Sequence, residues 1–510
     1  MSKGKKLALG LVIVILVIVV GLAIVIPLLV DIDRYRPQVA ARIQEETGKP
    51  AQIGKLALTI FPQVAIRVDD FSLDNPPGFP AGSFVKAQRI YAVVDGSALM
   101  HRQVVIKSLE LDTPNIRLLS DIHGKWNFEG PKKPAAVNPP PTADQASFTL
   151  GVIARVSVKH GEVMAANLLA SGATGPSLME VHGATLDLED VSLNALSETS
   201  LRRSDSPAEG LAVLRGWIGS IAYAADTQAP LIAQGTIKAD SLKFGPLGVT
   251  KLNSKLRLYP KQVFFDDLDL KCYGGEAKGS LSLNFAGTNL EYSTDARLKG
   301  INVAQFLNAF PQARGMMTGT LDGTAKVNGE VADKPDPLAG VHGGGQIDIR
   351  KGQLPSLQLN KNLRMLAQIT SFGPASGDPS SFSSISADFK IAAARLSSSK
   401  IVLLGNGVDA DGSGSMTMAG EGSLDYQGDA SLAAGGSNPL TSVLAGLSGA
   451  TVKDGKMVFP FGVTGTLAKP KFALKNGGKG PGAAPLTGAA GKDVDMAKGI
   501  MGMFKKKKPQ

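Results

Sequence analysis

The sequence is poor in cysteine and in aromatic residues. Its single cysteine, Cys272, excludes an intramolecular disulfide, so stability must come from packing and strand pairing. Aromatic residues make up only 5% of the 510 residues, whereas glycine (59) and proline (30) are frequent. This composition is typical of a chain rich in turns and β-strands.

The chain also carries little net charge outside its two ends. The formal net charge is +10, but Lys3, Lys5 and Lys6 together with the run 505–508 supply seven of these charges. A nearly neutral body with few aromatic side chains to stack on bases argues against nucleic acid as a partner.

No constellation of catalytic or metal-binding residues is found in the sequence. The acidic run Asp266-Asp267-Leu268-Asp269 could offer carboxylates to calcium, but it lies in an alternating segment and is interpreted as the solvated face of a strand. We therefore expect a protein that is not an enzyme and that uses no cofactor. The five histidines lie far apart and match no ligand spacing: His101, His123, His160, His182 and His342.

One long apolar run stands near the start of the chain, from Leu7 to Val30. At about 1.5 Å per residue a helix of this length spans roughly 36 Å, enough to cross a hydrocarbon core of about 30 Å. The run is too long for a cleavable signal peptide, no small-residue cleavage site closes it, and a buried core helix seldom lacks a polar face. It predicts an uncleaved, single-pass membrane anchor.

The charges that flank the run predict its orientation. Lysines precede it, and Asp31 and Asp33 follow it. By the positive-inside rule the amino terminus stays in the cytoplasm, and the rest of the chain lies across the inner (plasma) membrane.

Most of the remaining chain alternates between apolar and polar residues, as β-strands do. Clear examples are 104–111, 184–189, 254–259 and 320–327, separated by Gly- and Pro-rich turns. Helical patterns are few and short, and the first of them covers residues 33–47, ending at Gly48. We therefore expect a mainly β fold of mostly antiparallel strands after the anchor.

An array of strands with one apolar face must cover that face. Two architectures would cover it: successive β-sandwiches, or one long curled sheet whose apolar face lines a groove for an apolar ligand. The strand pattern taken alone favours sandwiches. If the sheet is a groove, the candidate lining residues are Leu256, Leu258, Leu268, Leu270, Leu281 and Leu283.

Several motifs follow the apolar run in a fixed order. They are Asp33-Arg34-Tyr35-Arg36-Pro37, Glu46-Thr47-Gly48-Lys49-Pro50, Ile53-Gly54-Lys55-Leu56-Ala57-Leu58, Val68-Asp69-Asp70-Phe71-Ser72-Leu73-Asp74-Asn75-Pro76-Pro77-Gly78-Phe79, Leu109-Glu110-Leu111-Asp112-Thr113-Pro114-Asn115-Ile116-Arg117-Leu118 and Gly124-Lys125-Trp126-Asn127-Phe128. Their order and spacing resemble the AsmA family of envelope proteins specifically, over residues 1 to about 130. The segments 345–354 and 458–471 look like the carboxy-terminal region of the same family, so the resemblance also covers 340 to 475.

The resemblance implies a periplasmic protein related to bridge-like lipid carriers, and it shifts the expectation from sandwiches to the groove. Proteins similar to this family are implicated in moving phospholipid toward the outer membrane and in the assembly and integrity of that membrane. The expected partners are the inner membrane, phospholipid acyl chains and outer-membrane or envelope assembly proteins. A structural or assembly factor built of sandwiches, binding envelope proteins without lipid, is the alternative.

The expected organisation has seven parts. They are a cytoplasmic tail at 1–6, the anchor at 7–30, an AsmA-like β region at 31–130, a Pro-rich linker or loop at 131–146, a middle β-array at 147–340 with an insertion at 198–230, an AsmA-like carboxy-terminal β region at 341–474 and a Gly- and Lys-rich tail at 475–510.

The carboxy-terminal tail allows two interpretations. Apolar residues at helical spacing before a lysine run suit a helix lying on an anionic membrane surface, at about 1 kcal/mol per lysine. A solvated, flexible end fits equally, because Gly499 and Gly502 weaken a helix. The residues concerned are Met496, Ile500, Met503, Phe504, Lys505, Lys506, Lys507 and Lys508.

Overall fold

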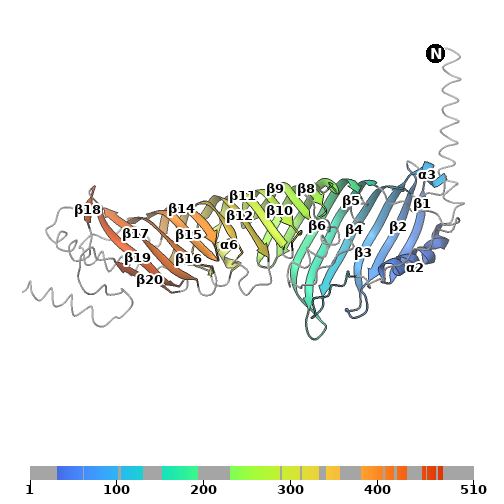
Figure 1. Ribbon diagram of the computed structural model, residues 1–510, viewed down its shortest axis with the longest axis horizontal. Coiled ribbons are helices and arrows are strands. Elements are labelled where there is room, and N and C mark those ends of the chain that lie inside the picture. Colours follow the sequence, from blue (N-terminus) through green and yellow to red (C-terminus); the bar gives the residue numbers. More distant parts are fainter. Residues whose placement is uncertain are drawn as a thin grey trace, which may run out of the picture. The chain divides into compact units, whose positions relative to one another are not determined.

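The computed structural model shows a mainly β, mostly antiparallel protein with few helices (Figure 1). The chain divides into two compact units: unit 1 is Met1–Leu298 with Lys326–Gly340, and unit 2 is Lys299–Ala325 with Val341–Gln510. The structure describes residues 32–60, 63–100, 105–129, 152–192, 230–287, 290–310, 313–331, 340–355, 381–405, 408–418, 422–433, 451–454, 456–466 and 469–474.

Unit 1 begins with a short helical segment. The 3-10 helix η1 (Ile32–Tyr35) leads into α2 (Arg36–Thr47), which has proline in its first turn. Gly48 ends α2 in the left-handed conformation, with φ of 68°, and its N–H donates to the Gln44 carbonyl at 2.7 Å. This confirms the helix predicted for residues 33–47.

Ten strands of unit 1 pair in sequence order. Every neighbouring pair is antiparallel except β4 and β5, which are parallel. A short helix, α3 (Gly96–Met100), precedes β4. The strands are β1 (Ala51–Thr59), β2 (Ala65–Asp74), β3 (Ser83–Val94), β4 (Ile106–Ser120), β5 (Val152–Leu168), β6 (Thr174–Ser192), β7 (Ala233–Phe244), β8 (Leu247–Tyr259), β9 (Gln262–Cys272) and β10 (Gly275–Asn284).

The parallel pair explains the longest connection in the first half of unit 1. A strand can follow a parallel neighbour only through a long return segment. The chain between β4 and β5 contains the Pro-rich stretch 131–146, which lies outside the described residues. Both strands belong to unit 1. The predicted domain boundaries stay predictions.

Strands β11 (Leu290–Asn302) and β12 (Thr320–Val331) have residues in both units. Unit 2 adds α6 (Val303–Asn308), whose amino terminus is capped by Asn302 Oδ1 accepting from the Gln305 N–H at 3.0 Å. Its strands are β13 (His342–Gln353), β14 (Ser381–Ala392), β15 (Arg395–Gly405), β16 (Val408–Thr417), β17 (Ser423–Ala433), β18 (Thr451–Lys453), β19 (Lys456–Thr466) and β20 (Pro470–Leu474).

The strands of unit 2 pair antiparallel from β13 to β17, and β17 then pairs with β19. The short strands β18 and β20 share the other edge of β19. One apolar cluster packs α6 against this sheet through Val303, Ile349, Leu354, Phe382 and Ile385.

No helix among the described residues has the length and apolar character needed to cross a membrane. The apolar run from Leu7 to Val30 falls outside those residues, so the anchor stays a prediction.

In unit 2 an irregularity between β14 and β15 is held by Asp388. Its carboxylate accepts the Lys400 N–H at 2.7 Å and the hydroxyls of Ser398 and Ser399 at 3.0 and 2.5 Å. The pairing register shifts at this point, between Ala387 and Lys390. These donors lower the pKa of Asp388 to about 2, the Ser399 hydroxyl contributing most.

We therefore expect Asp388→Asn to lower the stability of the protein at neutral pH. Because the pKa is lower in the folded state, the stabilising effect of Asp388 is complete above the ordinary carboxyl range and is lost as pH falls through about 2. The difference in urea midpoint between parent and variant should be constant from pH 7 to 5 and should shrink below pH 4. A difference that does not change with pH would contradict this assignment.

Candidate functional site

One face of unit 1 is lined by apolar residues that lie opposite one another from strand to strand. The first row crosses all ten strands from β1 to β10, with glycine as its smallest member. Its members are Leu58, Ile66, Ala92, Leu109, Val156, Leu188, Gly235, Leu256, Phe265 and Leu281.

Two further rows cross β1 to β8. The second row lies two residues from the first and ends in one polar residue. It consists of Leu56, Val68, Ile90, Leu111, Val158, Leu186, Ile237 and Ser254. The third consists of Ala51, Leu73, Val85, Ile116, Val163, Val181, Leu242 and Val249. Together the three rows define what we call the apolar face.

The third row shares a face with the other two because the alternation is interrupted between them. In the middle of each of the first five strands, two consecutive residues point away from the apolar face. In β1, for example, exposed Gly54 and Lys55 stand between buried Ile53 and Leu56. We call these five pairs the doubled row: Gly54-Lys55, Asp69-Asp70, Gln88-Arg89, Asp112-Thr113 and Lys159-His160.

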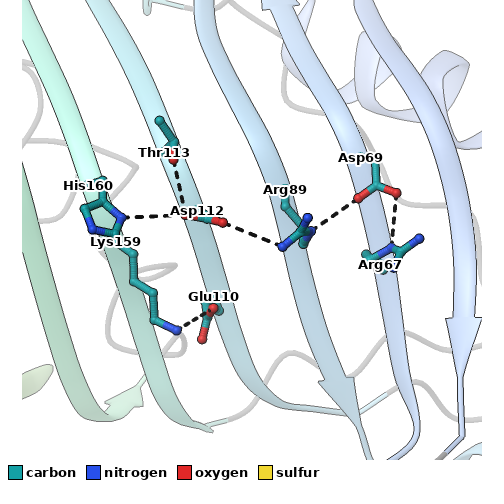
Figure 2. Close-up of polar contacts among 8 residues, drawn as sticks. All are labelled: Arg67, Asp69, Arg89, Glu110, Asp112, Thr113, Lys159 and His160. Atoms are coloured by element: carbon teal, nitrogen blue, oxygen red, sulfur yellow. Dashed lines mark hydrogen bonds and ion pairs between the residues drawn. The ribbon is translucent and has the colours of Figure 1, made fainter.

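The doubled row is charged, and its charges alternate across the strands (Figure 2). Asp69 lies opposite Arg89, Arg89 opposite Asp112, and Asp112 opposite Lys159. Arg89 lies 3.4 Å from Asp69 and 3.7 Å from Asp112, while Lys159 Nζ lies 2.7 Å from Glu110. One side of the sheet is therefore apolar and the other carries ion pairs.

A similar doubling in β9 sets the position of two predicted lining residues. Asp267 has a φ of 52°, and the register of β9 shifts between Phe265 and Leu268. This extra residue returns Leu268 and Leu270 to the side of Phe265, opposite Gly279 and Ala277 of β10.

All six predicted lining residues lie on the apolar face of β8 to β10. Leu256 and Leu283 are only 5% and 7% exposed and belong to a closed cluster at one end of the strands. Leu258 and Leu281 pack against this cluster half-buried, and Leu268 and Leu270 are also half-buried. That these residues line a groove stays a prediction.

The middle of the apolar face is less buried than its ends. Buried clusters form around Leu256 and Val263 near one end of the strands and around Leu118 and Trp126 near the other. Between them, residues such as Val158, Leu186 and Ile237 are only half-buried. The core of a sandwich would bury such positions fully. The described helices of unit 1, of 4, 12 and 5 residues, are too short to cover ten strands.

The acidic run of β9 is paired with bases on neighbouring strands. Asp266 accepts from Arg257 at 2.5 and 3.0 Å, Asp267 lies 2.7 Å from Lys255, and Asp269 lies 3.1 Å from Lys278. The hydrogen bond from Arg257 lowers the pKa of Asp266. These contacts agree with the interpretation of the run as the solvated face of a strand.

No group of three or more potential metal ligands gathers within the described part of the chain. His182 contacts Glu162 across β5 and β6, and His160 lies 3.9 Å from Asp112. His101 lies outside the described residues, as do all the predicted membrane-surface residues from Met496 to Lys508.

A family comparison adds to this geometry. The model of the AsmA family matches residues 1–168. This part of the chain belongs to the AsmA family. The match ends before β6, so the resemblance predicted for 340 to 475 stays a prediction. No curated protein and no solved structure matches the chain.

The structure brings the separate AsmA motifs together around one buried side chain, Asn127, which is 0% exposed. Its Oδ1 accepts the Leu119 N–H at 3.0 Å, and its Nδ2 donates to Arg117 O and Asn75 Oδ1, both at 2.7 Å. Asn75 in turn donates to Pro80 O at 2.9 Å. The turn after β2 is thereby fastened to the turn after β4.

A third AsmA motif joins the same cluster through Lys49, which is 3% exposed. Its ammonium donates to Phe128 O at 3.1 Å and lies 5.8 Å from the centre of the Phe84 ring. Burial, with a smaller effect of Lys125, lowers the pKa of Lys49. The AsmA motifs are thus joined to one another at one end of the sheet. The sequence shows the motifs, but it does not show that they contact one another.

Proposed function

We propose that this protein is anchored in the inner membrane and carries phospholipid through the periplasm toward the outer membrane. Acyl chains would lie on the apolar face of unit 1, away from water. The observation that supports this most is the set of three aligned apolar rows, whose middle stays half-buried and has no second layer of described strands over it. AsmA family sequence at residues 1–168 is consistent with such a role.

The energetics suit passive shielding. An acyl chain of about 16 methylenes costs around 13 kcal/mol to expose to water, at roughly 0.8 kcal/mol each. The ten strands, about 4.8 Å apart, give the face an extent of about 45 Å across the ladder. Its lining is uniform and lacks a cluster of polar groups, so a lipid could move along it without breaking strong contacts. Direction would be supplied by other components, and no catalytic step is involved.

The assembly-factor alternative requires sandwiches whose apolar faces are closed. In unit 1 the described strands form one ladder, which argues against that architecture there. The ion-paired side of the sheet could still bind envelope proteins. The following experiment distinguishes this alternative from lipid carriage.

The part of the chain from Asp33 onward, which lacks the predicted anchor, should co-purify with phospholipid when it is purified from bacteria as a soluble protein. Native mass spectrometry and solvent extraction of the purified protein would count the lipids per chain. Folded protein without phospholipid, in preparations where added lipid also fails to bind, would contradict the carrier function.

A further inference from the structure

Strand β1 lies at an edge of the unit 1 sheet. Among the described strands it pairs with β2 alone. A free edge presents unpaired N–H and C=O groups that can pair with another chain. The edge of β1 is open to such pairing because Ile53 to Thr59 is extended, contains no proline and carries one charge, Lys55.

Two AsmA side chains occupy this edge. Asp33 Oδ1 accepts the Leu56 N–H at 2.7 Å, and Arg36 Nη1 donates to Gly54 O at 2.6 Å. The two side chains also form an ion pair with each other, Arg36 Nη2 to Asp33 Oδ2 at 3.0 Å. The carboxylate and the guanidinium therefore hold the backbone groups on either side of Lys55.

This is the hydrogen-bond pattern that a neighbouring strand would make. In a parallel ladder, one residue donates its N–H to the carbonyl before its partner and accepts from the N–H after its partner. Arg36 supplies that donor and Asp33 that acceptor. The side chains reproduce one rung of a parallel strand opposite Lys55.

The backbone at this rung also depends on Gly54. A Cβ at Gly54 would lie 2.8 Å from the Asp70 Cβ and 3.1 Å from the Asp69 carbonyl oxygen. The absence of a side chain lets β1 approach β2 while its carbonyl faces Arg36.

We propose that Asp33 and Arg36 are a strand surrogate that keeps β1 from pairing with β1 of a second copy of this chain. A second copy is the occupant that the edge fits, because antiparallel pairing of β1 with itself gives a closed two-fold interface from one exposed edge. The surrogate keeps the sheet from extending through this edge.

The test compares the full chain with the variant Asp33→Ala/Arg36→Ala, both in a Cys272→Ser background with Lys55→Cys as the only cysteine. A bis-maleimide cross-linker reports when two β1 edges meet, and light scattering reports mass. Removing both hydrogen bonds should raise the cross-linked dimer fraction by about tenfold or more, since bonds to charged groups are the stronger ones. Arg42→Ala/Glu45→Ala is the matched control, because that pair is equally spaced on α2.

Two further variants keep the proposal falsifiable if the double alanine variant folds poorly. Arg36→Ala alone leaves Asp33 on Leu56 and should give an intermediate dimer fraction. Asp33→Asn/Arg36→Gln keeps an acceptor and a donor without charge and should stay mostly monomeric. The surrogate role is overturned if folded variants lacking both side chains stay monomeric, or if the Arg42 and Glu45 control dimerises to the same extent.

Discussion

Ile237→Asp should remove most of the bound phospholipid while the protein stays folded. Ile237 lies in the second apolar row, half-buried and outside the buried clusters. A carboxylate there must either lose its hydration under an acyl chain or exclude the chain, at a cost of several kcal/mol. Lipid per chain, measured after extraction, should fall by at least about tenfold, since tenfold corresponds to about 1.4 kcal/mol.

The matched control is Thr236→Asp. Thr236 is the neighbour of Ile237 on β7 and points to the opposite face, where it lies between Asp187 and Lys255 in the pairing. This variant should keep its lipid. Circular dichroism would confirm that both variants are folded. Equal lipid content in the two variants would show that acyl chains do not use the apolar face.

Asn127→Ala should strongly destabilise the AsmA region. The substitution leaves the Leu119 N–H, the Arg117 carbonyl and Asn75 Oδ1 without their partner in a buried site. At about 1 to 3 kcal/mol for each unsatisfied group, the free energy of unfolding should fall by about 4 kcal/mol. In a Trp217→Phe background, urea unfolding followed by the fluorescence of Trp126, which is 4% exposed beside Asn127, measures this change.

Asn115→Ala serves as the control for that measurement, because Asn115 lies exposed on the same strand, β4. Its effect should stay within about 0.5 kcal/mol, as is usual for surface substitutions. If Asn127→Ala were no worse than this control, the buried network would not be what fastens the turns after β2 and β4.

The sequence predicted the class of fold because the signal for strands is local. Alternation in 184–189 and 254–259 fell within β6 and β8, and the helix at 33–47 ended at Gly48 as expected. These features depend on neighbouring residues, which a single sequence displays fully.

The doubled row could not be predicted from local alternation. Two adjacent polar residues such as Asp69-Asp70 look like the end of a strand, yet each strand continues on the same face beyond them. Only pairing between strands shows that the interruptions align. The same holds for the parallel pair of β4 and β5 and for the meeting of Asp33 with Leu56, which join residues distant in sequence.

The sequence predicted which residues could line the apolar face, but it did not predict where along the strands that face is open or buried. The sequence named six leucines as candidate lining residues, and in the structure they share one side of β8 to β10. That they line a groove stays a prediction. Their unequal burial was not predicted, because it depends on Phe285 and Leu290 packing over the ends of the strands. A charge at Leu256 or Leu283 would therefore test stability, whereas Ile237 tests binding.

The doubled row also has a consequence for how the chain folds. In a sheet whose strands simply alternate apolar and polar residues, a hairpin that slips by two residues keeps its apolar residues on the same side. Such a register error therefore costs little free energy. Here such a slip would set a doubled pair against an ordinary alternating step and would break the sequence of opposite charges from Asp69 to Lys159. The doubled row thus fixes the register of each strand against its neighbour, because a strand paired out of register loses both the matched doubling and the ion pairs.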